Sequence, residues 1–219
     1  MNILKNISVV LGIMEKEAKK RKAPVFAFKK KTKNNAFKLL IATILSSRTK
    51  DEKTIQAIDR LFAFVSKPSD LAGLPIKKIE KLIYGVGFYR VKAKNIKKTS
   101  ELIVKKFNGK VPSNLNGLLE LPGVGRKVAN IVLSEAYRRR SIPVDTHVHR
   151  ISNRLGLVNT KNPAQTEREL LKIIPKKYIN NINHIFVAYG QTICLPRMPF
   201  CSICKIRRYC AKKGVSYSR

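Results

Sequence analysis

The sequence predicts an all-α protein, and three observations support this prediction. Strand patterns are scarce along the 219 residues. Apolar residues recur instead at helical spacing, as in Ile96, Thr99, Ile103 and Phe107 after Arg90. The segments between such patterns are short and polar, which is typical of turns between helices. We therefore expect roughly ten helices and little or no sheet.

The first of these helices is expected at the N-terminus. The apolar run from Ile7 to Met14 follows Lys5 and could imitate the apolar part of a signal peptide. It lacks a small-residue cleavage site, however, and Glu15 to Arg21 is densely charged. An amphipathic helix is the better interpretation. No span approaches the roughly 18 apolar residues of a membrane helix, so we expect an intracellular protein that does not contact a membrane.

The charge balance predicts a polyanionic partner. Lys and Arg number 46 against 13 Asp and Glu, which gives a formal net charge of +33. Such an excess destabilises a compact chain by self-repulsion unless a partner neutralises it. An anionic membrane usually requires one concentrated basic helix, whereas the basic residues here run along the whole chain. The composition therefore favours nucleic acid.

All four cysteines lie near the C-terminus, within 17 residues. They follow the spacing Cys194-x6-Cys201-x2-Cys204-x5-Cys210. A reducing compartment and this clustering favour a metal centre over disulfides. Four thiolates suffice for one tetrahedral centre, but the spacing alone does not distinguish Zn²⁺ from a [4Fe-4S] cluster.

A glycine-containing turn is predicted between two helices in the middle of the chain. The segment from Leu121 to Lys127 lies between two helical patterns. Pro122 helps to end the first helix, and Gly123 and Gly125 permit a tight turn. The second helix is expected to begin near Val124, with its free amides facing a phosphate. Such a hairpin positions DNA without reading its sequence, although an ordinary corner between helices has the same spacing.

From Leu118 to Leu157 the sequence closely resembles the catalytic core of the endonuclease III family of helix-hairpin-helix DNA glycosylases. Its marks are the hairpin and the loop Ile142 to His147, which contains Asp145. The similarity extends back through residues 87–89 and 45–51 and forward to the cysteines. It implies a two-lobed helix-hairpin-helix glycosylase fold with a C-terminal [4Fe-4S] loop. The implied domains are 28–138, a helical domain ending in the hairpin motif, and 1–27 plus 139–219, an iron-sulfur cluster domain.

The resemblance makes Lys127 the nucleophile. A lysine among 46 basic residues is ordinarily a phosphate contact or a solvated charge. Lys127, however, follows the hairpin in the first turn of a helix, where the positive helix end and Arg126 disfavour a charged ammonium, while DNA phosphates act in the opposite sense. In the family, the lysine at this position attacks C1′ of the damaged nucleotide, expels the base and forms a Schiff base, after which β-elimination breaks the strand on the 3′ side.

Asp145 has two compatible interpretations. Asp-Thr before Val148 is typical of a helix N-cap, a role worth about 1 kcal/mol. In the family, the aspartate at this position also helps to activate the nucleophile and stabilises positive charge developing on the sugar. We expect both roles to coexist in Asp145.

The resemblance also assigns the cysteines and several DNA contacts. Cys194, Cys201, Cys204 and Cys210 are expected to ligate a [4Fe-4S] cluster remote from the chemistry. The loop that this cluster closes, Leu195 to Phe200, would lie on the DNA backbone, with Arg197 as its only cation. Met198 and Phe200 stand where family members often carry basic residues, which weakens that expected contact.

Two further residues are expected to fill the gap that a flipped base leaves in DNA. Arg48 takes the position where the family often has Gln, and Phe88 takes the opposing wedge position. Core packing after a turn is the alternative for Phe88. Of the histidines, His147 is expected to contact the DNA backbone, whereas His149 and His184 are expected to be structural or surface residues. The hairpin residues Gly123, Gly125 and Arg126 complete the expected DNA contacts.

The expected function is a bifunctional DNA N-glycosylase and abasic-site lyase that removes damaged, oxidised pyrimidines during base excision repair. Its partner would be double-stranded DNA containing damaged bases or abasic sites, and we expect a monomer. One alternative is a monofunctional mismatch or adenine glycosylase of the same superfamily, which Lys127 disfavours. The other is a non-catalytic DNA-binding module with a structural metal, which only Lys127 and Asp145 together disfavour.

Overall fold

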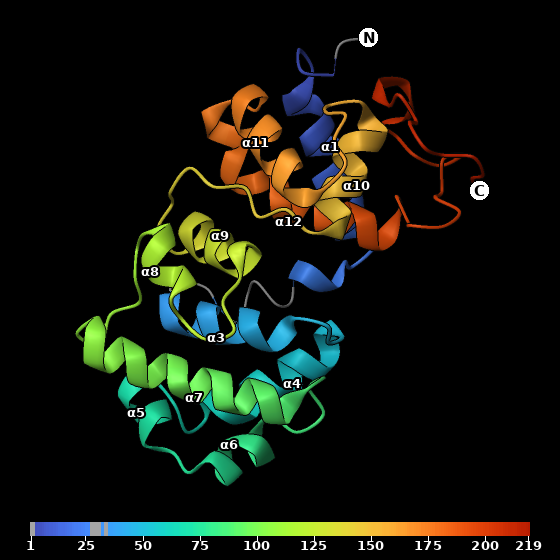
Figure 1. Cartoon of the computed structure of the whole chain (residues 1–219). Coiled ribbons are helices and arrows are strands. Elements are labelled where there is room, and N and C mark those ends of the chain that lie inside the picture. The colour runs from blue at the N-terminus through green and yellow to red at the C-terminus, as the bar shows by residue number, and fades with distance from the viewer. Residues whose placement is uncertain (1–2, 27–31, 33–34) are drawn as a thin grey trace. The chain divides into compact units, whose positions relative to one another are not determined.

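The computed structural model of the chain describes residues 3–26, 32 and 35–219. These residues form helices, turns and irregular loops without any β-strand, which confirms the all-α prediction (Figure 1). Two compact units are present. One is the continuous segment Phe28–Arg139, and the other combines Met1–Ala27 with Arg140–Arg219. We call them the central unit and the terminal unit.

The central unit contains seven helices among its described residues. They are α3 (Ala36–Ser46), α4 (Asp51–Phe62), α5 (Pro68–Gly73), α6 (Ile76–Leu82), α7 (Tyr89–Lys106), α8 (Leu115–Leu119) and α9 (Arg126–Glu135). Helix α3 is apolar nearly all round, and Leu39 to Leu45 are buried without interruption. A helix of that kind belongs in the interior of a unit, and α3 indeed packs against α4, α7 and α9.

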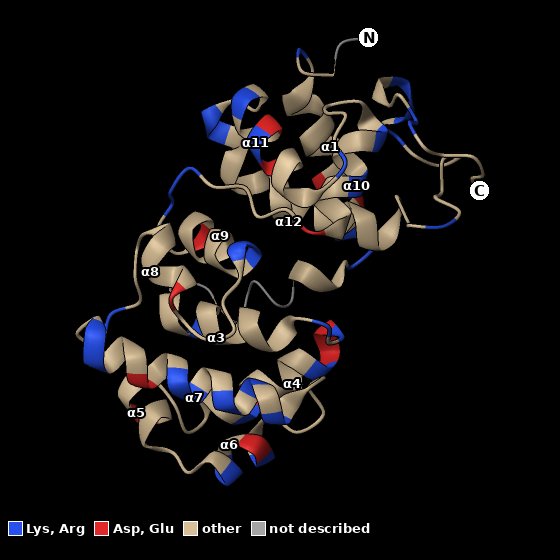
Figure 2. Cartoon of the chain, viewed as in Figure 1, with Lys and Arg blue, Asp and Glu red and all other residues tan. Residues whose placement is uncertain are grey.

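Helix α7 carries the predicted apolar spacing. Ile96, Thr99 and Ile103 are buried on one face, where α7 packs against α3, α5 and α6. Its other face is basic, and Figure 2 shows Lys and Arg recurring along it. Lys92 is an exception to this separation of apolar and basic faces, because it is buried on the apolar face with only 6% of its surface exposed.

The terminal unit is built around α12 (Lys176–Thr192), which packs against α1 (Ile7–Lys20) and α10 (Thr146–Leu155). Helix α11 (Pro163–Ile173) packs on α10, and a short 3-10 helix, η1 (Arg207–Tyr209), lies in the C-terminal segment. Helix α1 is amphipathic as expected, since Ile7, Val10, Leu11 and Met14 are buried. Across the described residues, no helix has the length and apolar character needed to cross a membrane.

Candidate functional site

The predicted hairpin joins α8 to α9 in the central unit. Gly123 has a φ of +80°, the left-handed region that favours glycine. Gly125 is the extended N-cap of α9, so the helix begins at Arg126 rather than near Val124 as expected. Val124 lies instead within the turn with its side chain buried, and its amide donates to Leu121 O at 3.0 Å. The late start leaves the whole glycine turn outside the helix.

Helix α7 holds this hairpin in place. The hydroxyl of Thr99 donates to Pro122 O at 2.8 Å. A Cβ added to Gly123 would come within 3.0 Å of Asn95 Nδ2, so the turn lies close against α7 at that point. The hairpin is thus fixed on one side by buried contacts and is exposed on the other.

Lys127 is the second residue of α9 and is exposed. Gly123, Gly125 and Arg126, which precede Lys127 in the sequence, are exposed too. All the hairpin residues that are predicted to contact DNA therefore lie on the surface of the central unit. No side chain caps α9 at Gly125. The first amides of a helix without a side-chain cap, together with the helix dipole, favour an anion such as a phosphate.

Asp145 lies in the terminal unit as the N-cap of α10. One carboxylate oxygen, Oδ1, accepts hydrogen bonds from the amides of His147 and Val148, both at 2.9 Å. The capping interpretation is therefore confirmed. The two bonds also fix the orientation of the carboxylate, and Asp145 remains partly exposed.

The three histidines lie in different surroundings. His147 Nδ1 lies 3.1 Å from Arg150 Nη2, and a Cβ on Gly190 would come within 2.4 Å of that ring nitrogen. Only glycine therefore permits this packing of α10 on α12. His149 Nδ1 lies 2.7 Å from Thr166 Oγ1, and His184 is buried, which agrees with structural roles for both.

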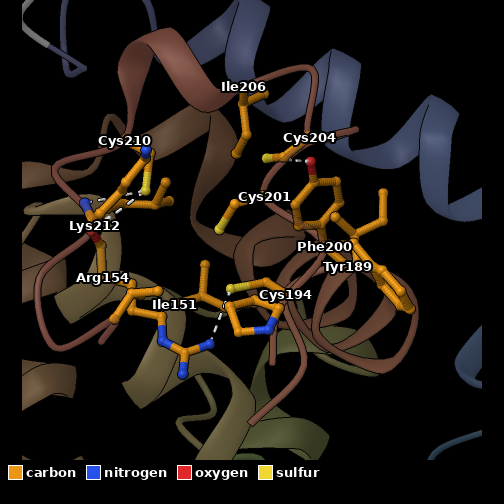
Figure 3. A pocket seen from close by; sticks show the side chains of 14 residues that line it. Ile151, Arg154, Tyr189, Cys194, Phe200, Cys201, Cys204, Ile206, Cys210 and Lys212 are labelled. Atoms are coloured by element: carbon orange, nitrogen blue, oxygen red, sulfur yellow. Dashed lines mark hydrogen bonds between the residues drawn. The ribbon is translucent and has the colours of Figure 1, made fainter. Parts of the chain in front are cut away.

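The four cysteines line one cavity of the terminal unit, which is partly open to solvent (Figure 3). All four are free thiols rather than disulfides, and all are partly exposed. Among the described residues, no three His, Cys, Asp or Glu side chains converge closely enough to hold a single metal ion. The four sulfurs nevertheless share one cavity, so they are the candidate ligands of the predicted metal centre.

The sulfurs also receive hydrogen bonds. Cys194 Sγ accepts from Arg154 Nη1 at 3.5 Å, Cys204 Sγ lies 3.2 Å from the Tyr189 hydroxyl, and Cys210 Sγ accepts from the amide of Lys212 at 3.4 Å. Burial raises the pKa of the Cys204 and Cys210 thiols. A thiolate there requires a compensating positive charge, and the donor set fits an iron-sulfur cluster on that ground.

Two arginines of α10 hold the start of the cysteine loop. Arg154 donates to Leu195 O at 2.6 Å and Pro196 O at 2.8 Å, and Arg150 donates to Cys194 O at 2.8 Å. Arg197 and Met198 are exposed in this loop, while Phe200 is half-buried and lines the cavity. The aromatic residue at 200 thus packs toward the sulfurs.

Arg48 and Phe88 lie together in the central unit, in loops before α4 and α7. The guanidinium carbon of Arg48 is 6.0 Å from the centre of the Phe88 ring. Phe88 is 64% exposed and has a φ of +58°, so the alternative that it packs in the core is wrong. Arg48 also has a positive φ, of +52°, and is exposed.

The sequence interpretation missed Lys92, whose ammonium is buried directly behind these two loops. It donates to Leu45 O at 2.8 Å, to Ser47 O, and to Thr49 Oγ1 at 3.0 Å. A signal existed in the sequence, because Lys92 stands four residues before Ile96 on the apolar face of α7.

Comparison with known proteins identifies relatives over most of the chain. Residues 41–176 match the family model described as HhH-GPD superfamily base excision DNA repair protein. The chain is 45% identical to endonuclease III of Thermotoga maritima over 80% of this chain and 82% of that protein. It is 40% identical to endonuclease III of a Synechocystis species, over 81% and 82% of the two chains.

Solved structures agree with these sequence matches. The fold is similar to that of a trapped endonuclease III–DNA covalent intermediate, with a TM-score of 0.80, 34% identity and 97% of each chain covered. A thermostable thymine-DNA glycosylase matches with a TM-score of 0.75 and 23% identity, and shares the fold.

Proposed function

The chain belongs to the HhH-GPD superfamily of base excision DNA repair proteins and to its endonuclease III family, and we propose that it is a bifunctional DNA glycosylase and abasic-site lyase. Its substrate is double-stranded DNA carrying an oxidised pyrimidine or an abasic site, and it acts as a monomer. The observation that carries this proposal is Lys127, exposed in the first turn of α9 directly after the glycine hairpin.

The proposed reaction begins at the Nζ atom of Lys127. Its neutral amine attacks C1′ of the damaged nucleotide, the bond from C1′ to the base nitrogen breaks, and the base leaves with a proton. The bond from C1′ to the ring oxygen O4′ then breaks as the C1′=N bond of a Schiff base forms, and the remaining amine proton moves to O4′. Removal of a proton from C2′ then expels the 3′ phosphate, and water hydrolyses the Schiff base to release the lysine.

Asp145 is the proposed partner of this lysine. Positive charge develops on the sugar as the base departs, and a fixed carboxylate stabilises such charge without having to reorganise. The two amide hydrogen bonds from His147 and Val148 supply the fixing. In this proposal the capping hydrogen bonds orient the same carboxylate that stabilises the positive charge on the sugar.

DNA is held by contacts spread over both units. The exposed hairpin residues Gly123, Gly125 and Arg126 bind the phosphate backbone through the N-terminus of α9. Arg48 and Phe88 occupy the gap left by the flipped nucleotide, and His147 and Arg197 contact the backbone. The net charge of +33 supports a polyanionic partner of this kind.

The four cysteines are the proposed ligands of a [4Fe-4S] cluster. When bound, the cluster supplies structural cross-linking of the loop from Cys194 to Cys210 and no part of the base excision chemistry. The cavity between the sulfurs, the hydrogen bonds that the sulfurs receive, and the burial of Cys204 and Cys210 support this assignment. A colourless protein with one zinc ion would contradict it.

Borohydride trapping tests the proposed function. Borohydride reduces a Schiff base to a stable amine, so the wild-type protein should become covalently joined to an oligonucleotide duplex with one abasic site. Lys127→Gln should abolish both trapping and strand cleavage while DNA binding is largely kept. Lys94→Gln, which changes an exposed lysine of α7, is the matched control and should behave as wild type.

The outcomes also separate the alternatives. Base release without strand cleavage or trapping would identify a monofunctional glycosylase. Binding without either reaction would identify a non-catalytic DNA-binding module. Trapping that persists at the wild-type rate in Lys127→Gln would show that another amine is the nucleophile.

A further inference from the structure

Lys92 has an unusual position for a lysine, because its ammonium is buried without a carboxylate partner. Only 6% of the residue's surface is exposed. All three of its hydrogen-bond acceptors are uncharged oxygens: Leu45 O, Ser47 O and Thr49 Oγ1. Burying an unpaired charge is costly, and a protein tolerates it only where its hydrogen bonds replace water. Such a costly group calls for a role beyond filling space.

The three acceptors lie at the end of α3 and in the turn that follows it. Leu45 is near the last turn of α3, whose terminal carbonyls have no partner within the helix. Ser47 is the C-cap, and Thr49 lies two residues further along. Arg48 stands between them with a positive φ of +52°. One ammonium therefore holds two backbone carbonyls before Arg48 and the side-chain hydroxyl of Thr49 after it.

The same turn is joined to the loop that carries Phe88. The amide of Gly87 donates to Thr49 Oγ1 at 3.1 Å, so this hydroxyl links Lys92 to both loops. The backbones approach closely, because a Cβ on Gly87 would lie 2.7 Å from Arg48 O. Phe88 comes next in the chain, has a positive φ of +58° and is the N-cap of α7, the helix that also carries Lys92.

We propose that Lys92 is a positioning residue that ties the Arg48 turn to the Phe88 turn, so that both side chains enter the DNA as one preset unit. This inference rests on the proposed function and adds a residue to it. Arg48 and Phe88 are exposed and strained in backbone, whereas the atoms behind them are buried and hydrogen-bonded. Filling the gap left by a flipped base needs both side chains in place together, and a displacement on the order of 1 Å can slow an enzymatic step about a hundredfold.

The chain offers a close control in Lys97, which lies five residues further along α7. Its ammonium donates to Ala72 O at 2.5 Å and Leu74 O at 3.0 Å. Lys97 therefore also holds backbone carbonyls, but those at the C-terminal end of α5 rather than those of the Arg48 turn. Lys97 differs in that it is less buried and also pairs with Glu101 at 3.4 Å. Lys92→Met and Lys97→Met each remove an ammonium that holds backbone carbonyls from the same helix, and only Lys92→Met should affect the turns that carry Arg48 and Phe88.

The first measurement uses a duplex with an abasic-site analogue, tetrahydrofuran, opposite 2-aminopurine. Insertion of Arg48 and Phe88 should unstack the 2-aminopurine and raise its fluorescence. Wild type and Lys97→Met should give the full rise at saturation, and Lys92→Met should give a much smaller one. Single-turnover excision of thymine glycol from a duplex should slow on the order of tenfold to a hundredfold in Lys92→Met. Lys92→Arg, which keeps donors at this position, should recover part of both.

The second measurement does not depend on DNA. Hydrogen exchange of free protein should accelerate together in residues 46–50 and 84–89 of Lys92→Met and stay normal there in Lys97→Met. If Lys92→Met does not fold, Thr49→Val removes the shared hydroxyl instead. Hydrogen exchange should then also accelerate in both segments, but less than is expected for Lys92→Met. Exchange that rises in only one of the two segments would contradict a common tie.

Failure of this inference can be distinguished from failure of the proposed function. If the wild type gives neither a fluorescence rise nor excision, the proposed function fails and the inference falls with it. If the wild type gives both, and folded Lys92→Met equals it in fluorescence and rate, the inference alone is overturned. Faster exchange with unchanged fluorescence would make Lys92 purely structural and would also overturn it.

Discussion

Arg154 Nη1 donates a hydrogen bond to Cys194 Sγ at 3.5 Å, and the same guanidinium binds the carbonyls of Leu195 and Pro196. Arg154 lies on α10, the helix that Asp145 caps. One helix therefore fixes the proposed catalytic carboxylate at its first turn and the start of the cysteine loop at its last. Stability, metal content and chemistry in the terminal unit can be separated by changing residues along α10 one at a time.

Replacing Arg154 by Met should weaken the cysteine loop. The partly buried carbonyls of Leu195 and Pro196 would lose a charged donor, and a hydrogen bond to a charged group contributes about 1.5–3 kcal/mol. We expect a clear fall in thermal stability and in iron and sulfide per purified chain. Arg197→Gln, a change at an exposed arginine of the same loop, should leave both values unchanged. Full iron loading in folded Arg154→Met would show that the loop needs no support from α10.

Substitutions at Asp145 should separate its capping role from its charge. Asn and Ser cap helices about as well as Asp, so Asp145→Asn and Asp145→Ser should keep the stability of α10 and lose turnover. Asp145→Ala should lose turnover and also about 1 kcal/mol of stability. Chemical denaturation and single-turnover excision measure the two effects. Normal turnover in Asp145→Asn would restrict Asp145 to its capping role.

A methyl group on Gly87 should disturb the two turns that Thr49 joins. The added Cβ would lie 2.7 Å from Arg48 O, so the backbone must shift, at a cost of about 1–3 kcal/mol. Gly87→Ala should therefore lower stability and slow excision from duplex DNA. Gly73→Ala in α5 is the control, since no atom lies within 4 Å of its added Cβ. Equal rates for the two variants would show that the turns tolerate displacement.

The elements that the sequence predicts correctly are those with local causes. The hairpin could be predicted because Pro122 and the glycines impose their own backbone. The cap at Asp145 could be predicted because the amides that donate to its carboxylate lie only two and three residues away. Helix α9 begins two residues later than the sequence predicts, because Val124 is buried in the core of the central unit, which is a tertiary effect. A contact between backbone atoms far apart in the chain produces no such local pattern in the sequence.

Lys92 illustrates what could not be predicted. Its partner Leu45 is 47 residues away, and the contact is to a backbone oxygen, which every residue type possesses. The sequence shows only a lysine on an apolar helix face, and such a lysine more often extends its charged end to solvent. The identity of the buried acceptors required the packing of α7 on α3.

Binding to undamaged duplex DNA should weaken steeply as salt rises. The net charge of +33 implies many phosphate contacts, and the logarithm of the binding constant falls by about 0.9 per phosphate neutralised for each decade of salt. Arg126→Gln should reduce this slope by about one contact, because Arg126 is exposed beside the hairpin. Fluorescence anisotropy at several salt concentrations gives the slope. A flat dependence would argue against DNA as the partner that the charge serves.

The final prediction concerns the pH dependence of Lys92. Burial lowers the pKa of Lys92 from 10.5 to about 8 in the folded chain. Between these values the unfolded chain binds a proton that the folded chain has released, so stability contributed by this residue rises with pH across that window. The neutral amine, however, has only two donors for the three oxygens around it. Above pH 8 the tie between the Arg48 and Phe88 turns should therefore weaken while the fold as a whole gains stability.

These opposite trends give the test. The free energy of unfolding, measured from pH 7 to 10.5 in wild type and Lys92→Met, should show an increment with rising pH in the wild type alone, of up to about 3 kcal/mol. The 2-aminopurine signal opposite tetrahydrofuran should decline over the same range in wild type and stay level in Lys92→Arg, whose guanidinium remains charged. Parallel pH profiles for all three proteins would show that Lys92 does not titrate in this range.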